Sequence, residues 1–205
     1  MSRSLLGCST ISMKQIFISL IFGVLFMSVQ HALAQTDSSP FKIKFLIEGG
    51  YEYGGVNLEG IYFTSDENKS LYAGEGGVLG FGGQLEFRQL KFLMIRSVLT
   101  SKLAFTGSGN GRVFFSRLPF HISSYFKVND ALRLGVGATT HFNAKVGGKG
   151  AFKNETLESS WSPRFEIGYR WIGVTYTPIV YTSEQYRLDT TTIGMFLSVP
   201  FGQKK

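Results

Sequence analysis

The chain has 205 residues, a formal net charge of +7 and 43% hydrophobic residues. Its positive residues are spread singly along the chain rather than clustered, so the basic balance does not indicate nucleic-acid binding. The single cysteine, Cys8, excludes a framework of disulfides within the chain.

Residues 1–34 have the features of a signal peptide that is cleaved on export. Lys14 precedes the apolar run from Ile16 to Val29, and Ala32-Leu33-Ala34 is a small-residue cleavage sequence. The run is shorter than the roughly 20 residues that a membrane-spanning helix needs. We therefore expect cleavage after Ala34 and one mature domain over residues 35–205.

The stretch from Phe41 to Tyr53 alternates apolar and polar residues, which predicts a strand with one apolar and one polar face. The apolar side holds Phe41, Ile43, Phe45, Ile47, Gly49, Tyr51 and Tyr53. The other side holds Lys42, Lys44, Leu46, Glu48, Gly50 and Glu52. Because a tilted strand crosses a bilayer with about 9–11 residues, this stretch is long enough to span a membrane.

Seven further stretches alternate in the same way, which predicts eight strands in total. They lie at 79–88, 91–103, 112–126, 132–142, 164–169, 172–176 and 193–201. Pro119 has no backbone N–H to donate to the neighbouring strand, which predicts a bulge in the fourth strand. Long connections are expected at 54–75, 104–111, 143–160 and 182–189, with tight turns between them. Long loops on one side and short turns on the other are typical of outer-membrane barrels, and this places both termini in the periplasm.

Alternation alone also fits a soluble eight-stranded barrel of the lipocalin type, with its apolar face inward. Two features favour the membrane. The polar face is rich in glycine, which suits a crowded lumen: Gly50, Gly80, Gly82, Gly135, Gly137, Gly168, Gly173 and Gly194. Aromatic residues also gather at strand ends, as in the two girdles of membrane barrels. We assign Tyr51, Tyr53, Trp161 and Tyr181 to the long-loop side, and Tyr125, Tyr169, Trp171 and Phe201 to the turn side. The predicted fold is therefore an all-β, eight-stranded, antiparallel up-and-down transmembrane β-barrel.

The signal peptide, the eight strands, the segment Leu118-Pro119-Phe120 and the near-terminal Phe201 together resemble a known family. They are similar to the small outer-membrane barrels of Bacteroidetes, of the porin-family or PorT-like kind. That resemblance covers nearly the whole mature chain and implies an outer-membrane barrel without an assigned activity. The polar residues after Phe201 depart from the strictly C-terminal aromatic of many such proteins.

Charged residues on the inward face define two hypotheses for the lumen. They are Lys42, Lys44, Glu48, Glu52, Glu86, Arg88, Arg96, Lys102, Arg133, Arg164 and Glu166. An eight-stranded barrel is just wide enough to be filled by side chains, so these groups predict a paired, hydrogen-bonded plug. The alternative is a narrow gated path for ions or small solutes, controlled by residues such as Glu86 and Arg133.

His121 and Ser123 share the inward face because they are two residues apart. With Glu166 or Glu86 they have the residue types of a hydrolytic triad. The pair resembles the His-x-Ser pair of an outer-membrane lipid A deacylase, which would make this protein a lipid-modifying enzyme. In that deacylase the pair faces lipid, whereas here Phe120 and Ile122 take that side, so we expect His121 to be a hydrogen-bonded lumen histidine.

We expect no catalytic residues, cofactor or metal site, because two histidines and no cysteine remain after cleavage. The predicted role is structural or loop-mediated: a monomeric barrel in outer-membrane lipid that presents its loops to an extracellular or periplasmic partner. The ion channel and the lipid-modifying enzyme remain the alternatives.

Overall fold

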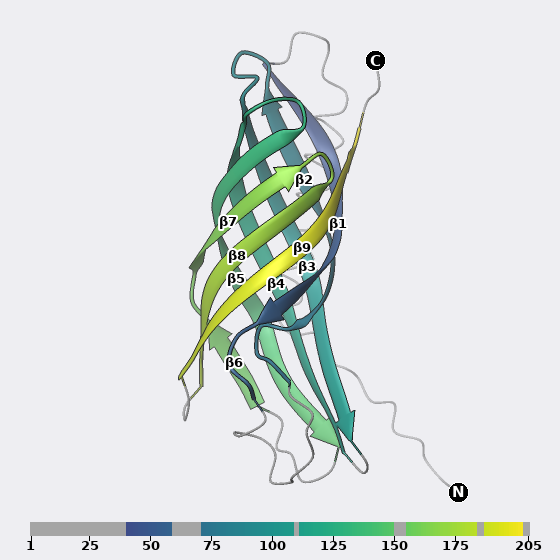
Figure 1. Cartoon of the computed structure of the whole chain (residues 1–205), viewed down its shortest axis with the longest axis vertical. Helices are drawn as coiled ribbons and strands as arrows, with labels where there is room; N and C mark the ends of the chain where they lie inside the picture. Colours follow the sequence, from purple (N-terminus) through teal and green to yellow (C-terminus); the bar gives the residue numbers. More distant parts are fainter. Residues whose placement is uncertain (1–39, 59–70, 109–110, 150–154, 184–186, 203–205) are drawn as a thin grey trace, which may run out of the picture. The chain divides into compact units, whose positions relative to one another are not determined.

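A computed structural model describes residues 40–58, 71–108, 111–149, 155–183 and 187–202, all of them in or between β-strands (Figure 1). The strands are β1 Phe41–Gly54, β2 Gly76–Phe87, β3 Leu93–Ser108, β4 Gly111–Lys127, β5 Leu132–Lys149, β6 Glu155–Ser159, β7 Ser162–Tyr169, β8 Ile172–Thr182 and β9 Arg187–Phe201. No helix among these residues is long and apolar enough to cross a membrane. The predicted signal peptide, residues 1–34, lies outside the described part of the chain.

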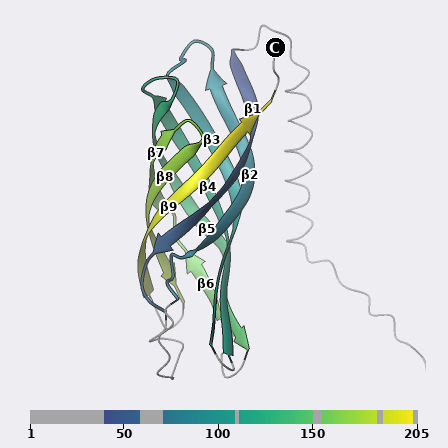
Figure 2. The same cartoon turned by 45° about the vertical axis from the view of Figure 1, so that its right-hand side comes forward.

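The strands form one closed antiparallel ring in which sequence neighbours pair. β1 pairs with β2 on one side and with β9 on the other, so the first and last strands close the barrel. The two views of the barrel show the strands running obliquely around a common axis (Figures 1 and 2). Closure removes the free sheet edges that a membrane does not tolerate. The predicted all-β up-and-down barrel is confirmed.

The described residues form nine strand segments where we predicted eight strands, because the sixth strand is interrupted. β6 and β7 both pair with β5 and with β8, so they occupy one place in the ring. The break falls at Ser160 and Trp161, between the two segments. The predicted number of strand segments was therefore wrong by one, although the described ring has the eight strand positions that were predicted.

The predicted faces of the strands are confirmed. β9 shows the alternation most simply, with Ile193, Met195 and Leu197 exposed and Thr192, Gly194 and Phe196 buried. Apolar side chains point out of the barrel in the middle of every position of the ring. They include Ile43, Ile47, Leu79, Phe81, Leu99, Ile122, Leu134, Val136, Phe165, Ile167, Val174, Ile193, Met195, Leu197 and Val199. We call this surface the apolar belt.

The pattern reverses on the long-loop side of the belt. In β9 the outward residues Arg187, Asp189 and Thr191 are polar, whereas the inward Leu188 is apolar. In β8 the inward side chains likewise change from Thr177 to Ile179. Within the belt the barrel is therefore apolar outside and polar inside. Beyond the belt the interior becomes apolar and the outer faces of β5, β6 and β9 become polar, whereas β3 and β4 keep Phe105 and Phe114 exposed there.

Several strands extend further than predicted on this side. The expected connection 104–111 is mostly strand, because β3 continues to Ser108 and β4 starts at Gly111. The expected connections 143–160 and 182–189 are shortened in the same way by β5, β6 and β9. The connection 54–75 is described only outside residues 59–70. β3 pairs with β2 only as far as Leu103, but with β4 up to Ser108, so these strands reach past their neighbours (Figures 1 and 2).

The irregularity predicted from Pro119 is present, but the extra residue lies on the neighbouring strand. Ser116 pairs with Lys145 and Leu118 pairs with Phe142, so β5 has one residue more than β4 between these pairs. Asn143, inside that interval, has a φ of 52°, as expected for a bulge residue in the left-handed region. The bulge keeps Phe142 outside while turning Ala144 inward.

Two of the predicted girdle aromatics are not on the outer surface. Tyr125 and Tyr181 are buried inside the barrel, because both occupy alternate positions of their strands whose side chains point inward. The other predicted members are exposed: Tyr51, Tyr53 and Trp161 on the long-loop side, and Tyr169, Trp171 and Phe201 on the turn side.

Gly82 and Gly83 give a matched pair for testing the tightness of the lumen. A Cβ on the inward-facing Gly82 would lie 2.1 Å from the backbone oxygen of Ser97, whereas a Cβ on Gly83 would meet nothing within 4 Å. We expect Gly82→Ala to destabilise the barrel by about 1–3 kcal/mol through overpacking against backbone. Gly83→Ala should change stability by less than about 0.5 kcal/mol. Urea midpoints in detergent micelles measure both, and equal midpoints for the two variants would contradict this packing.

Candidate functional site in the barrel lumen

The centre of the lumen is organised around Arg164 of β7. Its Nη2 lies 3.9 Å from Glu48 Oε1 and 3.9 Å from Glu166 Oε2, and its Nη1 lies 3.6 Å from Glu52 Oε1. All four side chains are almost fully buried. Buried charges are tolerated only when they are paired and hydrogen-bonded, so one guanidinium serves three carboxylates that come from two strands on different sides of the ring.

Each carboxylate has further partners. Lys102 of β3 donates to Glu52 and, at 2.6 Å, to the carbonyl of Gly74. Arg133 Nη2 and the hydroxyl of Tyr125 donate to Glu166 at 3.1 and 2.8 Å. The hydroxyl of Ser198 donates to Glu48 at 2.8 Å. These contacts link β1, β3, β4, β5, β7 and β9 across the lumen and form the paired plug that the charge pattern predicted.

Two buried arginines have no carboxylate partner among the described residues. Arg96 Nε donates to Gln84 Oε1 at 2.8 Å, and its guanidinium carbon lies 5.0 Å from the centre of the Tyr125 ring. Arg117 Nη2 donates to the carbonyl of Glu75 at 2.7 Å, and its guanidinium carbon lies 4.1 Å from the centre of the Phe115 ring. Stacking on aromatic faces stabilises both cations without cancelling their charge.

The buried charges of the described lumen are therefore unbalanced. The cations are Arg96, Lys102, Arg117, Arg133 and Arg164, and the carboxylates are Glu48, Glu52 and Glu166. Five cations against three anions leave an excess of positive charge inside the barrel.

Inward-facing glycines provide the room for these large groups. A Cβ at Gly135 would lie 2.5 Å from the Tyr125 ring, and a Cβ at Gly168 would lie 2.4 Å from the guanidinium carbon of Arg133. A Cβ at Gly173 would lie 2.8 Å from Glu166 Oε1. This confirms that glycine on the polar face belongs to a crowded lumen.

At the turn side the lumen is partly open and basic. Lys44 Nζ lies 2.7 Å and Lys127 Nζ 3.6 Å from Glu86 Oε1, and all three side chains are partly exposed. Lys42 and Arg88 are exposed at the same end. The predicted inward charges at this end therefore form a mouth rather than part of the buried plug.

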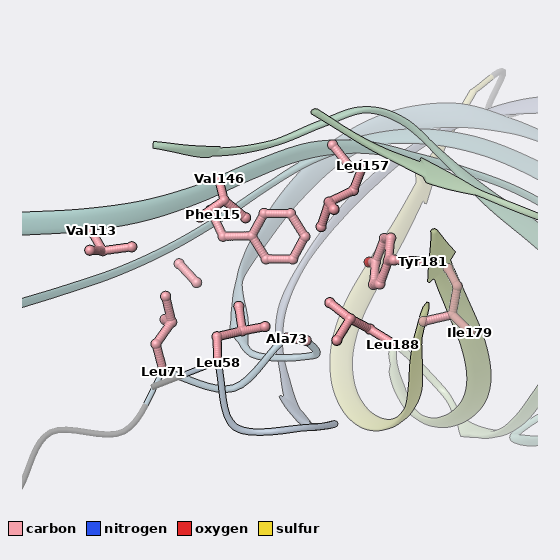
Figure 3. Close-up of a cluster of buried hydrophobic side chains, with 12 residues drawn as sticks. Leu58, Leu71, Ala73, Val113, Phe115, Val146, Leu157, Ile179, Tyr181 and Leu188 are labelled. Carbon is pink, nitrogen blue, oxygen red and sulfur yellow. The ribbon is translucent and has the colours of Figure 1, made fainter. Parts of the chain in front are cut away.

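At the long-loop side an apolar cluster closes the lumen (Figure 3). It consists of Leu58, Leu71, Ala73, Ala104, Val113, Phe115, Ala144, Val146, Leu157, Ile179, Tyr181 and Leu188. Leu58, Leu71 and Ala73 come from the described ends of the connection between β1 and β2, and their side chains pack inside the longer strands. The sequence did not predict this cluster, because the outer faces of β3 and β4 also carry apolar residues here, namely Leu103, Phe105 and Phe114, so the alternation that marks a strand is lost.

His121 and Ser123 both point into the lumen, as predicted, but they do not form a triad with Glu166 or Glu86. His121 Nε2 lies 3.5 Å from Glu48 Oε1, and no described residue hydrogen-bonds to Ser123 Oγ. Glu166 is occupied by Tyr125 and Arg133, and Glu86 lies at the turn-side mouth. The side chains of His121 and Ser123 are buried inside the barrel. That the protein is not an enzyme stays a prediction.

His141 contributes to the boundary between the charged plug and the apolar cluster. Its Nδ1 lies 2.5 Å from the hydroxyl of Tyr181, and its backbone N–H donates to Ser159 Oγ at 3.2 Å. The hydrogen-bonded lumen histidine that we expected was His121, which does lie in the lumen, but neither of its ring nitrogens has a hydrogen-bond partner among the described residues. Among the described residues, no group of three or more His, Cys, Asp or Glu side chains is placed to hold a metal ion.

A small cavity lies in the middle of this network. It has a volume of about 10 Å³, and its lining includes Glu52, Thr100, His121, His141, Arg164 and Thr177. A cavity of this size holds about one water molecule. At the level of Arg164 the lumen is therefore nearly filled by side chains.

No protein-family model matches the sequence, and no curated protein sequence matches it. Solved structures with a similar course of the chain include Ail, the attachment invasion locus protein of Yersinia pestis. Its structure alone and its complex with the heparin analogue sucrose octasulfate each match 78% of this chain and 97% of Ail, with 10% identity and TM-scores of 0.40 and 0.39. The backbone structure of Ail in a phospholipid bilayer nanodisc matches 77% of this chain and 100% of Ail, with 10% identity and a TM-score of 0.35.

Scores this low assign neither a family nor a function to the chain. The predicted relationship to Bacteroidetes barrels of the PorT-like kind has no support from these matches and stays a prediction.

Replacing Arg164 tests whether it holds the lumen together. Arg164→Met leaves three buried carboxylates without their common cation, so we expect a loss of about 3–5 kcal/mol in unfolding free energy. Arg187→Met is the matched control, because Arg187 and Asp189 form an exposed pair with 70% and 69% of their side chains accessible. Such pairs contribute about 0–1 kcal/mol. Urea unfolding in detergent would contradict the central role of Arg164 if both variants lost the same small amount.

Proposed function

We propose that this protein is an outer-membrane β-barrel whose barrel anchors it in lipid and whose long-loop side is a binding platform. The observation that carries this proposal is the reversal of polarity at the edge of the apolar belt. A soluble barrel keeps one polarity along its whole length, because water surrounds all of it. A barrel that leaves lipid and enters water must exchange its outer and inner polarity at the boundary.

The height of the belt supports the same proposal. Trp161 and Tyr169 stand at opposite ends of β7, eight residues apart. At about 3.3 Å per residue and a strand tilt of roughly 40°, that separation corresponds to about 20 Å along the barrel axis. Outer-membrane barrels have an apolar band about 25 Å tall between aromatic girdles.

The platform is the sheet that β3, β4 and β5 form beyond the belt. Its outer face carries Phe105, which is 83% exposed, and Phe114, which pairs with it across the strands. Beside them, Lys145 of β5 and Thr156 and Glu158 of β6 are exposed. Apolar residues on a water-exposed surface mark interaction sites, so this sheet is a better candidate for contacting a partner than the connections alone.

The packing of the lumen argues against the two alternatives, the gated channel and the lipid-modifying enzyme. An ion path would have to pass both the Arg164 network and the apolar cluster, which supports a closed barrel rather than a gated channel. A lipid-modifying enzyme would need His121 and Ser123 to reach lipid, yet both side chains point into the lumen. We further propose that the barrel is a monomer, that it is exported by a signal peptide, and that its termini lie in the periplasm.

Surface labelling tests the orientation and the exposure of the platform. Glu158 of β6 and Asp130 of the turn between β4 and β5 are both exposed and lie at opposite ends of the barrel. In a Cys8→Ser background, we expect Glu158→Cys to react with a bulky, membrane-impermeant maleimide on intact Gram-negative cells. Asp130→Cys should react only after the outer membrane is permeabilised. Labelling of Asp130→Cys alone on intact cells would reverse the proposed orientation, and labelling of neither in membrane fractions would contradict the proposal.

A further inference from the structure

The turns at one end of the barrel are joined to one another by backbone hydrogen bonds. Each bond links a turn or chain end to the next one around the ring, and the pairing of β1 with β9 completes the circle. We call this ring, residues 40–44, 86–92, 126–131, 169–172 and 198–202, the turn-side rim. The N–H groups of Arg88, Lys127, Arg170 and Ser198 donate to the carbonyls of Pro40, Phe92, Ala131 and Trp171, at 2.9, 2.7, 2.6 and 2.6 Å respectively. The rim is therefore a fixed surface rather than a set of independent turns.

The rim has a strong excess of positive charge. Its two carboxylates are Glu86 and Asp130, and Glu86 is already paired with Lys44 and Lys127. The side chains of Lys91 and Arg170 are exposed and form no salt bridge with any described residue. The cations of the rim are Lys42, Lys44, Arg88, Lys91, Lys127 and Arg170. Six cations against two carboxylates leave an excess of four positive charges at this end of the barrel.

Apolar side chains stand on both sides of the two unpaired turn cations. The guanidinium carbon of Arg170 lies 5.6 Å from the centre of the Tyr169 ring. The flanking residues, all of them exposed, are Leu90 and Phe92 for Lys91, and Tyr169 and Trp171 for Arg170. Aromatic rings and long cationic side chains prefer the level at which acyl chains meet headgroups, because each has an apolar part and a polar part. The rim thus places cations and apolar groups together at the edge of the apolar belt.

From this arrangement we propose that the turn-side rim binds anionic phospholipids. Lys91 and Arg170 contact the headgroup phosphates, and the side chains that flank them contact the acyl chains. This proposal rests on the membrane barrel of the proposed function, and in the orientation given there the rim lies in the periplasmic leaflet.

The composition of the rim favours a charged lipid over other phosphate compounds. A soluble phosphate would use the cations but would leave their apolar flanks in water. A zwitterionic lipid carries its own cation beside the phosphate, so it does not compensate the excess charge of the rim. An anionic phospholipid does both, since basic side chains at a membrane surface attract lipids with a net negative charge.

Quenching of Trp171 by brominated lipids tests the proposal, because Trp171 follows Arg170 directly. Trp161, at the other end of the belt, is the internal reference, and the Trp161→Phe and Trp171→Phe variants each keep one tryptophan. Both variants are placed in vesicles of equal parts phosphatidylglycerol and phosphatidylcholine, and only the choice of brominated lipid is changed. We expect Trp171 to be quenched as though phosphatidylglycerol were enriched about twofold or more around it. Trp161 should show a clearly smaller preference.

Substitutions in the Trp161→Phe background assign the preference to the rim. Lys91→Gln and Arg170→Gln together should bring the enrichment of phosphatidylglycerol around Trp171 close to the bulk level, because both unpaired cations are lost. Arg170→Lys keeps the charge and should keep the preference. Arg187→Gln removes an exposed cation at the other end of the barrel and should change nothing. Salt at about 1 M, where the Debye length is roughly 3 Å, should weaken the preference at Trp171.

Equal quenching of Trp171 by the two brominated lipids would overturn this proposal and leave the membrane barrel standing. Absence of quenching by either lipid would contradict the membrane barrel itself, so the two failures are distinguishable. A preference that survives the loss of both cations, or that is equally strong at Trp161, would also overturn the proposal, because the rim cations would not be its source. If the double variant does not fold, the salt series decides: a preference that 1 M salt leaves unchanged is not electrostatic.

Discussion

Burying three carboxylates inside a β-barrel costs free energy unless cations are held against them, and Arg164 is placed to do so for Glu48, Glu52 and Glu166 together. The rest of the interior depends on this arrangement. Tyr125, Lys102 and Arg133 approach the same carboxylates from other strands, and inward glycines leave space for them. The interior therefore works as a polar core that links strands far apart in sequence.

The same chain solves a second packing problem beyond the belt. There the outer faces of β5, β6 and β9 are polar and the interior is the apolar cluster, as in a water-soluble β-barrel. The two kinds of core meet at His141 and Tyr181, whose side chains are hydrogen-bonded to each other. Because the apolar cluster and the ion network each fill the lumen, the barrel is built as a rigid support for the sheet above it rather than as a pore.

Period-two alternation predicted which side chains of the belt point inward, including Glu48, His121 and Arg164, because strand geometry alone decides this. It could not predict their partners, since Glu48 and Arg164 meet only through the closure and tilt of the whole ring. It also placed a connection at 104–111, where β3 continues to Ser108 and β4 starts at Gly111, because the glycine and serine residues there are typical of a loop. Tyr125 and Tyr181 were placed wrongly, because they were assigned by their aromatic character. The alternation along β4 and β8 puts both side chains on the inner face.

Fluorescence quenching of the two native tryptophans by brominated lipids tests most directly whether the outer face lies in a bilayer. Trp161 and Trp171 are the only tryptophans of the chain, are 58% and 61% exposed, and lie at the two ends of the apolar belt. In reconstituted vesicles we expect strong quenching, greater for bromines near the headgroups than for bromines near the bilayer centre. Quenching no greater than in unbrominated lipid would mean that the belt does not contact lipid, and the membrane-barrel interpretation would be wrong.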